Sequence, residues 1–233
     1  MWSQMLFVID EIPTSWYVMV MNARPASDAR EKLLAAAFKV IREKGYAAMR
    51  VDDICEAAGL TKGAFFHHFK GKEDFAVAAA NHWSEVTGHL FANAPYHNHA
   101  DPLDRVLAYV DFRKAILQGT VPEFTCLVGT MVQEAYETNP AIREACDASI
   151  SGHAGEVEKD IVKAKELYAP DADWSAQSLA LYTQAVIQGA FILAKAKQGP
   201  DVAADCIDHL KRYIELLFNR DSTGSTRDDP SPT

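Results

Sequence analysis

The chain has 233 residues, enough for one core or two smaller ones, and its 48% hydrophobic and 24% charged content is ordinary for a soluble globular protein. Its formal net charge of −9 argues against a general nucleic-acid coat protein. The charge is uneven, however. Residues 28–72 carry nine Lys or Arg and six Asp or Glu, net +3, which leaves −12 for the remainder. A mildly basic N-terminal part on an acidic body fits local contact with DNA phosphates.

The cysteines, at positions 55, 126, 146 and 206, lie in helical patterns and include no CxxC pair. This spacing suits neither a zinc site nor a disulfide framework and predicts reduced, buried thiols in a cytoplasmic protein. We therefore expect no metal and no cofactor. No apolar run reaches the length of about 18 residues that a membrane span needs, so no membrane association is expected.

The N-terminal stretch 1–26 is expected to be a poorly ordered extension. It is rich in apolar residues, but Asp10 and Glu11 interrupt it and no basic residue precedes it, so a secretory signal is not expected. Met19 and Met21 leave open a later natural start.

The first predicted helix begins after Ser27 or Asp28, either of which can cap it, and ends near Gly45. A second, short helix follows. Its apolar stripe has the i, i+3, i+4, i+7 spacing and consists of Val51, Ile54, Cys55 and Ala58. Gly59 can adopt the left-handed conformation that ends a helix, and Thr61 can cap the next one.

In the third predicted helix Phe65 and Phe69 lie one turn apart and can face inward. Lys62, Gly63, Phe66 and His67 then lie on the opposite face. Two short helices joined by a glycine turn, the second with one aromatic and one partly basic face, indicate a helix-turn-helix. We expect residues 27–71 to form this DNA-binding domain, with the third helix in the major groove.

The remainder, 72–219, also shows helical patterns throughout, so the fold class is predicted to be all-α. Chain-order expectations are a helix over 72–91, a loop over 93–102, and further helices over 102–119, 124–136, 140–168, 174–198 and 200–217. The tail 220–233 lacks the apolar content to fold and is expected to be disordered.

The segment 174–198 is apolar on several faces, so most of its circumference must be buried. Together with the last helix it could form half of a four-helix bundle across a two-fold axis, which predicts a homodimer through the last two helices. The alternative is that both helices close the core of a monomer. The dimer is favoured because one helix-turn-helix contacts few bases.

The stretches REKLLAAAFKVIREKGY (30–46) and VDDICEAAGLTKGAFFHHFKGKEDF (51–75), with the helical body behind them, resemble the tetracycline-repressor (TetR) family of bacterial transcriptional regulators. The resemblance implies a DNA-binding domain of three helices and a helical remainder that dimerises and encloses a small-molecule site. By matching position, the implied DNA-binding residues are Arg50, Thr61, Lys62, Gly63, Ala64, Phe66, His67, His68 and Lys72.

Two positions depart from the family pattern. Arg50 stands where a Ser or Thr cap is common, which leaves the capping of the second helix open, although Arg50 could reach a phosphate. Phe66 stands where a tyrosine is common, so a hydroxyl contact to phosphate is missing. His67 and His68 are adjacent on a helix and would not converge on one metal ion.

A small hydrophobic or aromatic effector is expected in the body, and aromatic, soft or thiol side chains are its candidate ligands. They are Phe112, Phe124, Cys126, Met131, Trp174 and Tyr182. Each could equally be core packing. For Cys126 the choice between a sensing thiol, as in a relative within the resembled family, and a small buried hydrophobe stays open.

These patterns predict a ligand-responsive transcriptional regulator, more specifically a repressor that binds a palindromic DNA operator as a homodimer. The alternatives are an all-helical small-molecule-binding protein or enzyme with an incidental helix-turn-helix, and a purely protein-binding dimer. No convergent set of catalytic residues is recognised in the body, so the chain is not expected to be an enzyme.

Overall fold

The computed structural model describes residues 28–220, and these residues form helices without a β-strand. The predicted all-α fold is confirmed. The N-terminal extension (1–26) and the tail beyond Arg220 lie outside the described residues. The chain divides into two compact units, one with the residues up to Phe91 and Ile116–Ile150, the other with Ala92–Ala115 and the residues from Ser151 onward.

The first unit contains the N-terminal helices and two short helices from the middle of the chain. They are α2 (Ala29–Lys44), α3 (Val51–Ala58), α4 (Lys62–His68), α5 (Lys72–Ala92), α7 (Val121–Phe124), α8 (Leu127–Ala135) and the start of α9 (Pro140–Tyr168). Helix α2 packs against α3, α4, α7 and α8. This grouping cuts the chain elsewhere than the expected domain boundary at residue 72, and the assignment of functional domains stays a prediction.

Helix α2 begins and ends as its sequence indicates. The Asp28 side chain accepts a hydrogen bond from the Glu31 backbone N–H at 2.8 Å, which satisfies one of the donors that a helix N-terminus leaves open. The helix ends at Gly45, whose φ of 81° lies in the region that L side chains disfavour.

The middle of the chain differs from the expected helices over 102–119 and 124–136. Helix α6 (Pro102–Ala115) ends earlier, and Gly119 has a φ of 81°, which a continuing helix cannot accommodate. Glu123 then accepts from the Thr120 backbone N–H at 2.5 Å, which starts the separate short helix α7. Helix α8 begins after Cys126, whose Sγ accepts from the Gly129 N–H at 3.3 Å.

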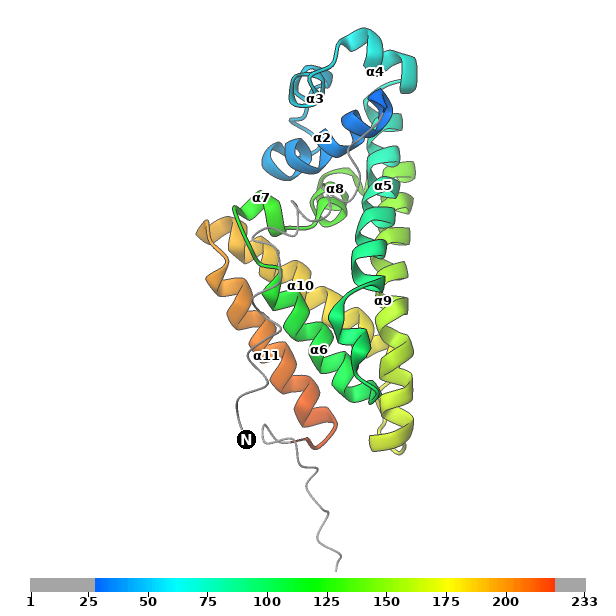
Figure 1. Ribbon diagram of the computed structural model, residues 1–233, viewed down its shortest axis with the longest axis vertical. Coiled ribbons are helices and arrows are strands. Elements are labelled where there is room, and N and C mark those ends of the chain that lie inside the picture. Colours follow the sequence, from blue (N-terminus) through cyan, green and yellow to red (C-terminus); the bar gives the residue numbers. More distant parts are fainter. Residues whose placement is uncertain (1–27, 221–233) are drawn as a thin grey trace, which may run out of the picture. The chain divides into compact units, whose positions relative to one another are not determined.

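The second unit contains η1 (Pro95–Asn98), α6, the end of α9, α10 (Ala176–Lys197) and α11 (Asp201–Leu217). The turn η1 lies inside the segment that was expected to be a loop. The expectation that a helix starts at Trp174 was also wrong, because Ser175 is the cap and accepts from the Ser178 N–H at 3.1 Å. Helix α11 packs against α10 and α6 within this unit (Figure 1).

Helix α10 is long and apolar enough, by length and composition, to cross a membrane, and it is the one such helix in the described part of the chain. Its Leu179, Ile187 and Phe191 are buried, and it packs along α11, whose Ile207 and Ile214 are buried as well. A core helix passes the same test of composition, and these contacts are those of a core helix.

Candidate nucleic-acid interface

A cluster of phenylalanine rings supports α4 from below. Phe65 is fully buried and Phe69 is 3% exposed, so the predicted inward orientation of both rings is confirmed. Their centroids lie 5.4 Å apart, and Phe75 of α5 lies 5.2 Å from Phe65 and 5.0 Å from Phe69. Tilted and edge-on pairs at these distances are favourable aromatic contacts, which fix α4 on α5.

The turn before α4 has the conformation that its sequence predicts. Gly59 is left-handed, with φ of 65° and ψ of 34°, and the Leu60 N–H donates to the Cys55 carbonyl at 2.9 Å. The Thr61 hydroxyl accepts from the Ala64 N–H at 3.2 Å and caps α4. Helix α4 therefore leaves α3 at a fixed angle after a short turn.

The face of α4 opposite the phenylalanine cluster is open to solvent. Lys62, Gly63, Phe66 and His67 are exposed, with Phe66 at 56%, while Ala64 and His68 are partly covered. A large apolar ring so exposed has no role in the core of this unit. A Cβ added to Gly63 would meet only the Thr61 hydroxyl, at 3.6 Å, so the surrounding protein does not require a glycine there.

Carboxylates of α3 hold two of the expected DNA-binding cations. The Lys62 ammonium lies 2.8 Å from Asp52, and the Arg50 guanidinium lies 3.4 Å from Asp53. The Lys62 and Arg50 side chains remain 61% and 76% exposed. Both therefore keep access to solvent while their direction is set by α3.

Asp53 resolves the capping of α3. Arg50 is the cap residue, and Asp53 accepts its backbone N–H at 2.9 Å, the half of a capping box that the third helical residue supplies. Asp53 also accepts from the Lys44 ammonium at 2.9 Å. The hydrogen bond from Lys44, followed by that from the Arg50 backbone, lowers the pKa of Asp53 from 3.8 to about 2.

Lys72, at the start of α5, contacts the loop between α2 and α3. Its ammonium donates to the Ala47 carbonyl at 2.9 Å and lies 4.7 Å from the centroid of the Tyr46 ring. Partial burial lowers the pKa of Lys72, and the charge of Glu134 acts in the opposite direction. Sequence reasoning singled out Lys72 but not these contacts.

Two residues that sequence reasoning did not single out join α2 and its loop to α7 and α8. Arg42, 4% exposed, donates to the carbonyls of Glu123 at 3.0 Å and Thr125 at 3.1 Å. Glu134 accepts from the Ala47 N–H at 2.6 Å. The spacing of Arg42 from Phe38 was a usable signal, because a residue four positions after an inward phenylalanine lies on the same helix face.

The expected effector ligands fall into separate places. Phe124, Cys126 and Met131 belong to the first unit, where Phe124 and Met131 are buried in the core. The other three belong to the second unit and have different neighbours. Phe112 lies against Tyr96, Trp174 against Phe218, and the 45%-exposed Tyr182 against Tyr213. The assignment of these side chains to one effector site stays a prediction.

No group of three His, Cys, Asp or Glu residues that could hold a metal ion occurs within residues 28–220. His67 and His68 contact each other edge-on, with ring centroids 4.8 Å apart.

Known proteins resemble both parts of the chain. A family model described as bacterial regulatory proteins, tetR family, matches residues 33–79, and one described as transcriptional regulator LmrA/YxaF-like, C-terminal domain, matches residues 102–206. The transcriptional regulator AcuR of Cereibacter sphaeroides is 31% identical over 113 residues, 48% of this chain and 52% of AcuR. This match spans about half the length of AcuR.

The HTH-type transcriptional repressor NemR of Escherichia coli is 23% identical over 196 residues, 83% of this chain and 98% of NemR. The crystal structure of its reduced form has a TM-score of 0.69 at 22% identity and covers 79% of this chain and 96% of that one. A regulatory protein TetR from Rhodobacter sphaeroides has a TM-score of 0.68 at 24% identity, with coverage of 79% and 98%. These two structures share the fold.

An exposed, capped helix on an aromatic support, reached through a left-handed glycine turn, defines a helix-turn-helix transcriptional regulator. The family models extend that conclusion to both parts of the chain. The chain belongs to the TetR family of bacterial regulatory proteins.

Proposed function

We propose that the protein is a cytoplasmic repressor that binds a palindromic DNA operator as a homodimer and leaves it when a small hydrophobic or aromatic effector binds the helical body. The observation that carries the DNA-binding part is the exposed face of α4, in which Lys62, Phe66 and His67 project away from buried Phe65 and Phe69. A helix presented in this way has the form of a major-groove reader.

The contacts divide by the chemistry of each side chain. Lys62 and His67, with Phe66, form the ridge that enters the groove, where lysine recognises guanine edges and apolar groups contact thymine methyls. Gly63 lets the helix backbone approach the DNA, and Thr61, Ala64 and His68 flank the ridge. Arg50 and Lys72 contact phosphates, which position the protein without reading sequence.

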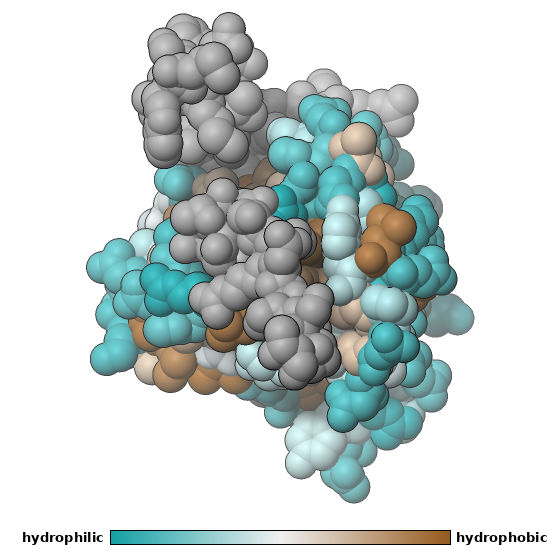
Figure 2. Space-filling view, turned by 90° about the horizontal axis from the view of Figure 1, so that it is seen from below, coloured by the Kyte–Doolittle hydropathy of each residue, from teal (hydrophilic) through white to brown (hydrophobic). Residues whose placement is uncertain are grey.

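The outer faces of α10 and α11 supply the homodimer interface in this proposal. Large apolar side chains are exposed there at helical spacing, and a view from below shows apolar patches among hydrophilic residues (Figure 2). They are Leu181, Tyr182, Ile192, Leu193, Tyr213 and Leu216. Two copies related by a two-fold axis would bury these faces in a four-helix bundle.

A symmetric pair would present its two α4 helices to successive major grooves about 34–36 Å apart. The effector releases DNA only if it binds more tightly to a dimer with a different separation. About 3 kcal/mol of differential binding shifts the balance roughly 150-fold.

A gel shift with the DNA upstream of the protein's own coding region tests the proposal. The full-length protein should retard this DNA in a sequence-specific and salt-dependent manner, and Lys62→Ala should weaken specific binding by at least about tenfold. Lys39→Ala is the matched control, since it removes the same charge from a 62%-exposed side chain on α2. Equal affinity for operator and unrelated DNA would contradict the proposal.

The same gel shift discriminates the alternatives. An all-helical enzyme or carrier with an incidental helix-turn-helix, and a purely protein-binding dimer, both predict no salt-dependent shift with any DNA.

A further inference from the structure

The second unit buries a group of polar side chains that the DNA-binding proposal does not use. Tyr109 and Arg113 of α6, His153 of α9 and Gln184 of α10 meet there, and we name them the Arg113 cluster. Tyr109 is 2% exposed, Gln184 4% and Arg113 8%. The Tyr109 hydroxyl lies 2.9 Å from His153 Nε2 and accepts from Gln184 Nε2 at 3.1 Å.

The hydrogen bonds assign the protons of the cluster. Gln184 Nε2 and Arg113 Nη1 can only donate to the Tyr109 oxygen, so the Tyr109 hydroxyl hydrogen points to His153 Nε2. His153 Nε2 is then an acceptor, and its ring carries the proton on Nδ1. Burial, followed by the charge of Arg113, lowers the pKa of His153 from 6.5 to about 3, which agrees with a neutral ring.

With these protons assigned, the cluster is rich in donors and carries one fixed positive charge. The guanidinium of Arg113 has N–H donors and no acceptor, and it stays charged at any physiological pH. Its hydrogen-bond contacts to Tyr109 and His153, at 3.4 Å each, are both to uncharged groups and are long. Charge-assisted bonds from a guanidinium to a carboxylate are shorter, about 2.7–2.9 Å, and about twice as strong.

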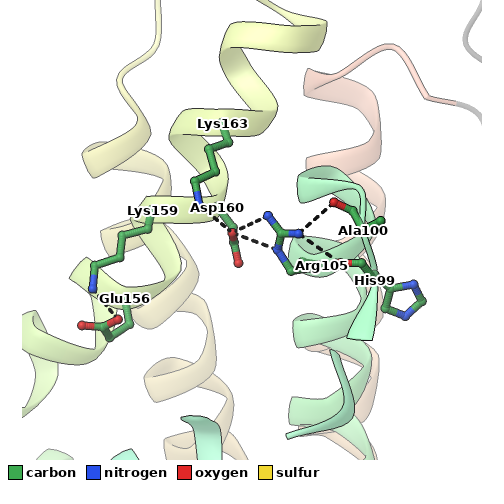
Figure 3. A network of polar contacts seen from close by, with 7 residues as sticks. All are labelled: His99, Ala100, Arg105, Glu156, Lys159, Asp160 and Lys163. Carbon is green, nitrogen blue, oxygen red and sulfur yellow. Dashed lines mark hydrogen bonds and ion pairs between the residues drawn. The ribbon is translucent and has the colours of Figure 1, made fainter. Parts of the chain in front are cut away.

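Two carboxylates of α9 that act electrostatically on Tyr96, beside the cluster, are engaged by other cations. Asp160 accepts from both Nε and Nη2 of Arg105 at 2.9 Å, and Glu156 lies 2.6 Å from Lys159 (Figure 3). Arg105 is fixed in turn by the carbonyls of His99 and Ala100. The Asp160 and Glu156 carboxylates therefore have their own cationic partners within this network.

Aromatic rings adjoin the polar group. Arg113 lies 5.9 Å from the centroid of Phe191, and Tyr96 lies 5.5 Å from Tyr109 and 5.9 Å from Phe112. A buried guanidinium costs stability unless an interaction offsets the loss of water, and rings offset it only in part. The surroundings suit a ligand with an acidic end and a flat apolar remainder.

We propose that the Arg113 cluster binds the carboxylate of a small aromatic acid, which is the effector class of this regulator. In this arrangement the carboxylate takes a bidentate contact from Arg113 in place of the two long contacts to Tyr109 and His153, and Tyr109 and Gln184 fix its orientation. Phe112, Phe191 and Tyr96 contact the ring of the acid. The inference rests on the proposed function, because it names the chemistry of the effector that releases DNA.

Benzoate and benzamide test the proposal, because they share a shape and differ in charge. With the full-length protein, benzoate should raise the melting temperature and bind at least about tenfold more tightly than benzamide in calorimetry. Arg113→Met should abolish this preference. Arg113→Lys, which keeps the charge without the bidentate geometry, should bind benzoate more weakly and still prefer it to benzamide.

Lys114→Met is the matched control. It removes a cation from the neighbouring residue, which pairs with Asp208 instead, and should leave the preference for benzoate unchanged. If Arg113→Met fails to fold, Tyr109→Phe replaces it, and the loss of the hydroxyl should weaken benzoate binding relative to benzamide.

Equal binding of the two probes by the wild-type protein, or no binding of benzoate up to ~50 mM, would overturn the carboxylate site, as would an undiminished preference in Arg113→Met. A gel shift without either probe tests DNA binding independently. Benzoate preference without operator binding would reject the repressor function and keep the site. Operator binding without benzoate preference would reject the site alone.

Discussion

The Glu134 carboxylate accepts a hydrogen bond from the Ala47 backbone N–H at 2.6 Å, which ties α8 to the loop between α2 and α3. Lys72 holds the carbonyl of the same residue from α5. Both peptide groups of Ala47 are thus fixed by charged side chains from outside the helix-turn-helix. The direction in which α3 leaves this loop depends on α5 and α8 as well as on its own sequence.

Lys72→Ala should weaken binding to all DNA sequences alike, since a phosphate contact carries no sequence information. Loss of one phosphate contact should also reduce the slope of log affinity against log salt by about 0.9. Filter binding or anisotropy at several salt concentrations measures both quantities. Lys72→Arg should retain the wild-type slope, and an unchanged slope in Lys72→Ala would refute the phosphate contact.

Arg42→Met should lower the free energy of unfolding by about 2–4 kcal/mol, because it leaves buried carbonyls of Glu123 and Thr125 without their donor and removes a cation 5.1 Å from the Trp83 ring. Urea unfolding followed by circular dichroism measures this loss. Lys39→Met, on the exposed side of the same helix, should change the free energy by less than about 0.5 kcal/mol. Equal effects would mean that the Arg42 contacts contribute little.

Stability should fall on acidification through Asp53. Its pKa is about 2 in the folded protein and 3.8 ordinarily, so the folded state favours the ionised form. This contribution is complete above about pH 4 and disappears as the pH falls toward about 2. Melting temperatures across this range should decline less steeply for Asp53→Asn than for the wild type. Asp52→Asn, which breaks the exposed pair with Lys62, is the comparison, and parallel curves for wild type and Asp53→Asn would exclude the effect.

Leu216→Glu should shift the proposed homodimer toward monomer and reduce operator affinity, since it places a charge in an apolar interface. Light scattering coupled to size-exclusion chromatography measures the mass. Leu167→Glu, on α9, is the control, because Leu167 is 62% exposed and Leu216 74%. A dimer that survives Leu216→Glu and dissociates with Leu167→Glu would place the interface elsewhere.

Local chemistry made the helix-turn-helix predictable. Gly59, Thr61, Phe65 and Phe69 each act within a few residues of their own position, through a left-handed turn, a cap and one helix face. The break between α7 and α8 was harder to see. It depends on the conformation of Gly119 and on a capping interaction of Glu123 in a stretch whose apolar pattern reads as one helix.

Long-range contacts were not accessible from the sequence. Arg42 and Glu123 are 81 positions apart, and Tyr109 and Gln184 are 75 apart, so no periodicity relates them. The search for effector ligands favoured aromatic and soft residues and therefore missed Arg113, because a charged residue on a helix is usually assumed to face water. The cluster becomes visible only when α6, α9 and α10 are brought together.

The ion pair between Lys62 and Asp52 means that DNA must compete with a carboxylate for the lysine at the tip of α4. An arbitrary sequence that offers only phosphates exchanges one anionic partner for another and gains little. A correct site adds base contacts to the exchange. The acid on α3 therefore acts as a filter against the vast excess of unrelated sequence in a genome, and it sharpens discrimination at the expense of grip.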